Sequence, residues 1–270
     1  MATFYKLMGV ASDGFDPEQR FVTSWLLPPS LLAAYRLLFA LFDWATIITI
    51  FIWDGINDPD EIARDFSYFT ALTWWGLTTY LTISGLHTLV YSSKGYTWLH
   101  RSWPRPLQVL HSLFYTTIVV FPFIVTIVYW AILYDGPWFS VKMSAFANVS
   151  RHALNSLAAL LEIILPATSP PPWLHVLFLI VLLAMYLGLA YVTHVTQGFY
   201  VYSFLNPARG AGQLAGYIVG IAVACVVIFL LARSLVWARK RFTGPGKRSK
   251  NDMPRHNDPY TDQQLEMSAK

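Results

Sequence analysis

Long apolar stretches recur along the whole 270-residue chain, separated by short polar or Pro/Gly-rich connectors. A helix needs about 20 predominantly apolar residues to cross the hydrocarbon core of a bilayer, and the stretches are close to that length. Tryptophan and tyrosine gather at their ends, as expected at the headgroup level. The pattern therefore predicts six membrane-spanning helices, at Leu31–Trp53, Tyr68–Tyr91, Leu107–Leu133, Asn148–Leu165, Trp173–Tyr200 and Gly212–Trp237.

Composition agrees with a membrane protein and excludes a sizeable soluble domain. Hydrophobic residues make up 55% of the chain and charged residues 13%, with a mean hydropathy of +0.44. Soluble domains carry about 25% charged residues, which is enough for a polar outer shell. The single cysteine, Cys225, lies within an apolar stretch, so the sequence predicts no disulfide framework.

Charge between the predicted helices is distributed unevenly. The connector Asp54–Ser67 carries five acidic residues and one arginine, whereas Ser92–Pro106 carries Lys94, Arg101 and Arg105 and no acid. Six Lys and Arg residues follow the last stretch between positions 239 and 250. Because positive loops stay in the cytoplasm, both chain termini are expected there, and the acidic connector is expected on the luminal or outer side.

The predicted fold is thus an all-α polytopic bundle in three parts. A cytoplasmic N-terminal segment covers residues 1–30, the six-helix membrane domain covers 31–238, and a disordered basic cytoplasmic tail covers 239–270.

Ionisable side chains within predicted spans are costly in a bilayer and are therefore functional candidates. Span four places its polar residues at steps of three and four, which gives one polar stripe along the helix. Either a hydrogen-bonded seam between helices or a functional cavity accounts for such a stripe. The stripe consists of Asn148, His152, Asn155, Ser156, Ala159 and Glu162.

Two of these candidates are expected at a similar depth near the outer surface. Thr70 lies in the first turn of span two and His152 in the first or second turn of span four. A hydroxyl and an imidazole at one depth are the minimum for nucleophilic acyl transfer, although a threonine in a membrane helix more often only packs. Glu162 lies about 15 Å further along the helix, so it cannot orient the His152 ring directly.

Other polar residues have competing interpretations. Asn155 could orient the His152 ring or donate to an oxyanion. His194 and Arg151 could bind a substrate carboxylate or a water, but an inter-helix hydrogen bond and interfacial snorkelling explain them equally well. Arg36 and Asp43, seven residues apart, are expected to pack or to pair locally.

Metal and cofactor chemistry has no sequence signature. The seven histidines are scattered singly, without the HxxH clusters of membrane di-iron enzymes, and no metalloprotease or P-loop motif occurs. We therefore expect no metal and no cofactor. Nor do we expect a nucleic-acid partner, because the partner that the composition implies is membrane lipid.

Three segments resemble one known family. They are Ser67–Leu72, Asn148-Val-Ser-Arg-His152 with Glu162 ten residues later, and Thr193–Tyr202. The chain is similar in these segments to the androgen-induced-protein family, which includes the androgen-dependent TFPI-regulating protein, and resembles a fungal branch of it.

The resemblance implies an activity. Mammalian members are multi-pass membrane proteins that hydrolyse fatty acid esters of hydroxy fatty acids with an intramembrane threonine and a histidine. Thr70 falls on the nucleophile and His152 on the catalytic histidine. Val149 and Thr193 replace family histidines and Gln197 is an insertion, so the surroundings of the catalytic pair differ from the family pattern.

Two rival functions follow from the same residues. A catalytically inactive lipid-binding or regulatory membrane protein would keep the fold without needing the Thr70 hydroxyl. A transporter is a third interpretation, but the sequence shows no internal repeat to support it.

Overall fold

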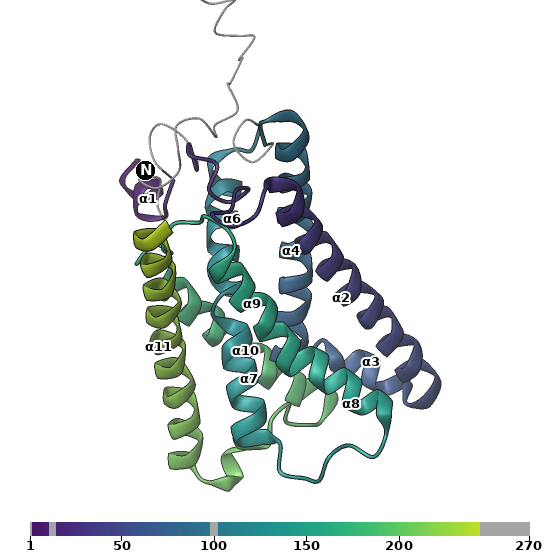
Figure 1. Ribbon diagram of the computed structural model, residues 1–270. Coiled ribbons are helices and arrows are strands. Elements are labelled where there is room, and N and C mark those ends of the chain that lie inside the picture. Colours follow the sequence, from purple (N-terminus) through teal and green to yellow (C-terminus); the bar gives the residue numbers. More distant parts are fainter. Residues whose placement is uncertain (1, 11–14, 98–101, 244–270) are drawn as a thin grey trace, which may run out of the picture.

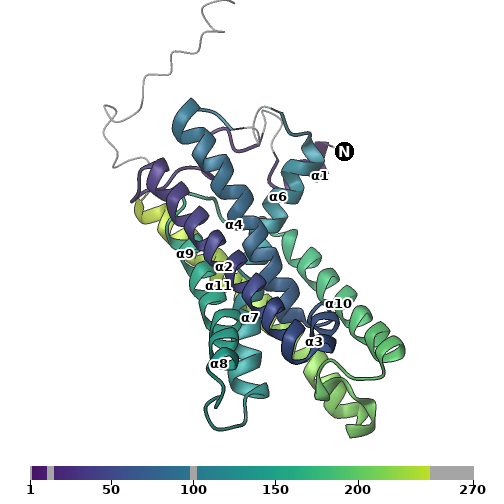
Figure 2. The same cartoon turned by 90° about the vertical axis from the view of Figure 1, so that its right-hand side faces the viewer.

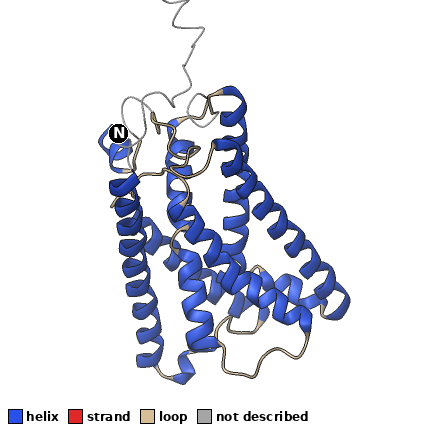
Figure 3. Cartoon of the chain, viewed as in Figure 1, coloured by secondary structure: helices blue, strands red, loops and turns tan. Residues whose placement is uncertain are grey.

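A computed structural model describes residues 2–10, 15–97 and 102–243 of the chain. Within these residues the secondary structure is helical and no β-strand occurs, as predicted (Figure 3). The short α1 (Ala2–Leu7) precedes the long α2 (Pro29–Asn57), and α3 (Pro59–Asp65) connects α2 to α4 (Phe69–Lys94). The remaining longer helices are α6 (Arg105–Ile118), α7 (Phe121–Val128), α8 (Lys142–Val149), α9 (Asn155–Ile164), α10 (His175–Gln197) and α11 (Ala211–Thr243).

Each of the six predicted spans corresponds to helical structure. Among the described residues, four helical stretches are long and apolar enough to cross a membrane: α2, Arg105–Leu133, α10 and α11. Helix α4 and the segment 142–164 are not among the four. Both carry many buried polar side chains that face other helices, which lowers their hydropathy.

The third predicted span is broken rather than continuous. Helix α6 ends at Ile118, and α7 begins three residues later with Pro122 at its second position. Proline has no N–H to donate, so it fits the first turn of a new helix and interrupts an old one. A π-helical turn, η1 (Tyr129–Leu133), then extends α7.

The fourth predicted span begins six residues too late. Helix α8 starts at Lys142, and a π-helical turn, η2 (Ser150–Leu154), joins it to α9. His152 therefore lies in the third helical turn and not in the first or second. The helix extends beyond the apolar stretch because Met143 packs into a cluster that includes Ile47 and Trp74.

The predicted start of the tail is also wrong. Helix α11 continues to Thr243, so residues 239–243 are helical and not disordered. Arg239 explains the extension, because its guanidinium donates to the carbonyl oxygens of Ile163 and Thr168 on a neighbouring segment. The remaining part of the predicted disordered tail, residues 244–270, lies outside the described residues.

Different segments of the chain lie at the two ends of the bundle. Helix α1 and the C-terminal end of α11 lie at one end, together with the end of α4 (Figures 1 and 2). Helix α3 and the short 3₁₀ turns η3 (Ser203–Leu205) and η4 (Pro207–Arg209) lie at the other end. Helices α8 and α9 run obliquely past α2 and α7 between these ends (Figure 1).

The outer surface of the bundle is apolar. Large aliphatic side chains are exposed along α2, α10 and α11, a pattern that soluble monomers avoid and that lipid tails accommodate. Representative residues are Leu38, Leu41, Ile48, Leu177, Val181, Met185, Val223 and Leu231.

A buried ion pair joins α2 to α9. The Arg36 guanidinium donates from Nε and Nη2 to the two carboxylate oxygens of Glu162 at 2.8 and 2.7 Å, and both side chains are 0% exposed. Arg36 also donates to the carbonyl of Phe21 and to the Thr88 hydroxyl, each at 2.8 Å.

The pair corrects the sequence-based expectation for Arg36. We expected packing or local pairing with Asp43, but the partner lies 126 residues away in sequence. Asp43 instead accepts from Thr78 at 3.4 Å. Spacing along one helix could not reveal this, because the partner depends on how the helices pack.

Removing one partner of this pair should destabilise the fold strongly. Arg36→Gln or Glu162→Gln leaves an uncompensated buried charge, which costs about 3–5 kcal/mol. The double variant R36M/E162M should lose less, since no buried charge remains. The unfolding temperature in detergent micelles measures the stability of each variant, and the two single variants should unfold at lower temperature than the double variant.

The matched control is Arg64→Gln, which breaks an exposed pair with Glu61. Such pairs are worth below about 1 kcal/mol. If Arg36→Gln unfolds at the same temperature as this control, the buried pair does not hold α2 to α9.

Candidate active site

Thr70 is the second residue of α4, and α10 fixes the position of this helix start. The backbone N–H of Phe69 donates to the Tyr186 hydroxyl at 3.1 Å, and that hydroxyl donates to the carbonyl of Ser67 at 3.0 Å. Thr193 adds a bond of 3.1 Å to the Ser67 hydroxyl. The prediction that Thr70 lies in the first turn of its helix is confirmed.

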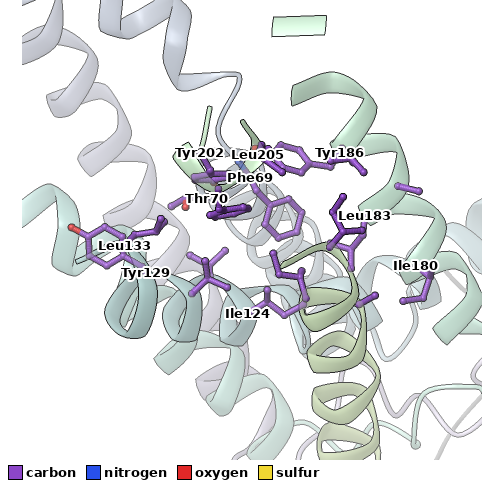
Figure 4. A pocket seen from close by; sticks show the side chains of 18 residues that line it. Phe69, Thr70, Ile124, Tyr129, Leu133, Ile180, Leu183, Tyr186, Tyr202 and Leu205 are labelled. Carbon is purple, nitrogen blue, oxygen red and sulfur yellow. Dashed lines mark hydrogen bonds between the residues drawn. The ribbon is translucent and has the colours of Figure 1, made fainter. Parts of the chain in front are cut away.

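Thr70 lines an apolar cavity of about 180 Å³ between α4, α7, α10 and α11 (Figure 4). The wall is almost entirely hydrocarbon, and the lining residues that carry a hydroxyl are Thr70, Tyr129, Tyr186 and Tyr202. An apolar pocket with a few convergent polar groups is typical of a ligand site. Its apolar lining includes Phe69, Ile124, Val128, Leu183, Leu187 and Ile221.

The Tyr202 phenol lies against Thr70. Both residues line the cavity, and the Tyr202 hydroxyl lies near the Thr70 hydroxyl. Figure 4 shows Thr70, Phe69 and Tyr202 together on the cavity wall, with Tyr129 on the adjoining part. The nucleophile candidate is thus surrounded by hydrogen-bonding groups in an otherwise apolar space.

His152 is buried in the π-helical turn η2, and its ring is fixed on two sides. The ring stacks on Tyr129, with centroids 3.5 Å apart and planes 8° from parallel. Its Nδ1 lies 3.0 Å from the carbonyl oxygen of Asn148. Because a carbonyl only accepts, Nδ1 carries the proton, and the lone pair of the neutral ring is on Nε2. This tautomer suits a general base.

Tyr129 lies between the two candidate residues, because it contacts His152 and lines the same cavity as Thr70. Its ring stacks on His152 and also lines the cavity that Thr70 lines. Tyr129 and His152 both lie in π-helical turns, which are rare and frequent at functional sites. No hydrogen bond joins Thr70 to His152 in the described part of the chain.

The polar stripe of span four faces inward, as predicted. Several of its members form an inter-helix seam: Asn148 accepts from the Tyr129 hydroxyl at 2.6 Å, and Ser156 donates to the carbonyl of Pro122 at 2.9 Å. The seam therefore explains much of the stripe. His152 Nε2 lies outside it, because no hydrogen bond to this atom occurs among the described residues.

Asn155 is buried one turn beyond His152 and has no hydrogen-bond partner for either amide atom among the described residues. Buried amides are normally satisfied, so a water or a ligand atom fits this place. The side chain does not line the cavity of Thr70.

Arg151 and His194 are held by other parts of the protein. Arg151 forms a 2.8 Å ion pair with Asp65 and lies over the Trp74 ring, 5.5 Å from its centroid. Burial raises the pKa of the Asp65 carboxyl, and the neighbouring guanidinium opposes this shift. His194 stacks on Tyr200 with centroids 3.7 Å apart. Neither Arg151 nor His194 lines the cavity.

Metal ligation has no support in the described residues. Nowhere in this part of the chain do three His, Cys, Asp or Glu side chains gather closely enough to hold a metal ion.

Comparison with known proteins adds no family assignment. No family model, no curated protein and no solved structure matches the chain. The functional argument therefore depends on the residues of this site.

Sequence reasoning did not single out the three cavity tyrosines as site residues. Tyr202 lies in the segment Thr193–Tyr202 that carries the family resemblance, which was the available signal. Tyr129 and Tyr186 had none, because one aromatic residue in an apolar helix is indistinguishable from a packing residue.

Arg151 and Asp65 should show strong energetic coupling. Arg151→Gln leaves the buried Asp65 carboxylate unpaired, whereas D65N/R151Q removes the charge as well. We expect a coupling of about 0.5–3 kcal/mol from the double-mutant cycle. Additive effects on the unfolding temperature would show that the ion pair contributes nothing.

Proposed function

We propose that the protein is an intramembrane threonine hydrolase that cleaves lipid esters, with fatty acid esters of hydroxy fatty acids as the expected substrates. One observation carries the proposal: the Thr70 hydroxyl opens into an apolar cavity whose wall includes Tyr129, on which the base candidate His152 is stacked. The apolar wall suits acyl chains, and the few hydroxyls suit an ester group.

In the proposed reaction, the ester enters sideways from the bilayer. His152 Nε2 takes the Thr70 proton, and Oγ1 attacks the carbonyl carbon. The alcohol departs with a proton from His152 and leaves an acyl-threonine. Water, deprotonated by His152, then releases the acid and restores Thr70. The His152 side chain must reach Thr70 or act through one intervening water.

The arrangement of the resembling segments supports this assignment. Thr193 bonds to Ser67, and Tyr202 lines the same cavity as Thr70, so two segments far apart in sequence meet at the nucleophile candidate. The third segment, with His152, reaches the same cavity through Tyr129. Packing alone would not require that all three segments converge.

The proposed topology has six spans with both termini in the cytoplasm. Helix α1 and the end of α11 lie at one end of the bundle, as an even number of crossings requires (Figure 1). Lys94 and the basic end of α11 belong to that end, and the acidic α3 belongs to the other. This distribution fits the positive-inside rule.

A catalytically inactive lipid-binding or regulatory protein is the second candidate. It is favoured by one observation, that no hydrogen bond joins Thr70 to His152 within the described residues. It predicts that a lipid ester binds and is not turned over, and that Thr70→Ala binds it equally well.

Hydrolysis should depend on both candidate residues. Purified protein in detergent should cleave a branched hydroxy-fatty-acid ester in preference to a phospholipid or a triglyceride. Thr70→Ala should abolish turnover, and His152→Ala should lower it by about 10²–10⁴-fold, the usual contribution of a general base. A fluorophosphonate probe should label the wild type and not Thr70→Ala.

Thr73→Ala is the matched control, since Thr73 is buried on the same helix about one turn away. It should retain turnover and labelling. Equal hydrolysis by wild type, Thr70→Ala and His152→Ala would refute the proposed function, as would a folded wild type without activity.

Helix α4 provides the critical test of topology, because it is not among the four most apolar helices. Asp60 lies before it and Lys94 is its last residue, and both are exposed. With Cys225 buried, Asp60→Cys and Lys94→Cys can be labelled singly in sealed vesicles with an impermeant maleimide. The two positions should label from opposite sides; labelling from the same side would show that α4 does not cross.

A further inference from the structure

We propose that Tyr202 is a further catalytic residue, whose phenol donates a hydrogen bond to the carbonyl oxygen of the substrate as that oxygen becomes negative. The inference rests on the hydrolase function proposed above. It starts from one juxtaposition: Tyr202 and Thr70 line the same cavity and lie together on its wall (Figure 4).

The position of the phenol suits a donor to the reacting ester. Tyr202 and Thr70 line one cavity of about 180 Å³, and Thr70 is the second residue of α4. An ester carbonyl that the Thr70 hydroxyl attacks therefore has the Tyr202 side chain beside it. A phenol in this place can donate to the oxygen that becomes negative.

The hydroxyl groups of the other two cavity tyrosines already donate hydrogen bonds to other residues. Tyr186 donates to the carbonyl of Ser67, and Tyr129 donates to the Asn148 side chain. The Tyr202 hydroxyl lies near the hydroxyls of Thr70 and Tyr186, and among the described residues no carbonyl oxygen accepts from it. A hydroxyl proton rotates about its C–O bond, so it can leave these weak acceptors for a developing oxyanion.

The loop that carries Tyr202 is built to hold it over the start of α4. Helix α10 ends at Gly198 with φ +79°, a left-handed conformation that suits glycine and turns the chain back. The Tyr202 ring then stacks on Phe204, with centroids 5.2 Å apart and planes 7° from parallel. This stacking holds the phenol at Thr70.

The step conserves atoms and charge. Thr70 Oγ1 forms a bond to the carbonyl carbon, and its proton moves to the base. The carbonyl π electrons move to the oxygen, which becomes an alkoxide stabilised by the Tyr202 O–H. When the C–O bond to the alcohol breaks, the electrons return, and the Tyr202 proton stays on the phenol throughout.

The test compares Tyr202→Phe with Tyr68→Phe. Tyr68 is a neighbouring ring that makes no described contact with the Thr70 hydroxyl, so its variant controls for the loss of a phenol in this cluster. Loss of one oxyanion donor should lower kcat by about 10²–10³-fold. KM should stay within a few-fold for Tyr202→Phe, and fluorophosphonate labelling should slow. Tyr68→Phe should behave like the wild type.

The outcomes separate this proposal from the one on which it rests. If Tyr202→Phe keeps the wild-type kcat while Thr70→Ala is inactive, Tyr202 is not catalytic and the hydrolase proposal stands. If Thr70→Ala remains active, the hydrolase proposal fails first.

If Tyr202→Phe does not fold, 3,5-difluorotyrosine at position 202 keeps the shape and makes the phenol more acidic. Activity should then be lost at lower pH than in the wild type, because a phenolate cannot donate. An unchanged pH profile would overturn the proposal.

Discussion

The buried pair of Arg36 and Glu162 is the constraint on which the rest of the bundle depends. A buried ion pair is stable only if its hydrogen-bond geometry is good and the remaining N–H donors also find acceptors. Arg36 meets this demand by bonding to Glu162 on α9, to Thr88 on α4 and to the Phe21 carbonyl before α2. One side chain thereby fixes three helical segments, and with them the depth of His152 on the turn before α9 and of Thr70 on α4.

The other end of α4 is organised by hydroxyl groups. Tyr186 bonds to the Phe69 N–H and the Ser67 carbonyl at the helix start, where N–H groups lack intrahelical acceptors in an apolar environment. A side chain that satisfies the backbone at the helix start therefore also lines the candidate site. Thr70 has polar neighbours because the helix start needs hydrogen-bond partners, and the acyl transfer that we propose uses these neighbours.

Much of this architecture could be predicted from apolar stretches and steps of three and four. The helical class and the inward polar stripe of span four are confirmed. The start of the fourth helix, the end of the sixth and the partner of Arg36 could not be predicted, because they depend on contacts with Trp74, Thr168 and Glu162 from other segments. Of the candidate site residues, Thr70 lines the cavity and His152 reaches it through Tyr129, whereas the structure holds Arg151 and His194 elsewhere.

The central claim is that Thr70 becomes acylated, and a trapped intermediate tests it most directly. The protein would be mixed with an excess of a long-chain p-nitrophenyl ester, quenched in acid within the first turnovers, digested and analysed by mass spectrometry. The account predicts an acyl group on the peptide that contains Thr70, with fragmentation placing it on Thr70 itself. Turnover without an adduct, or an acyl group on His152, Tyr202 or another side chain, would contradict it.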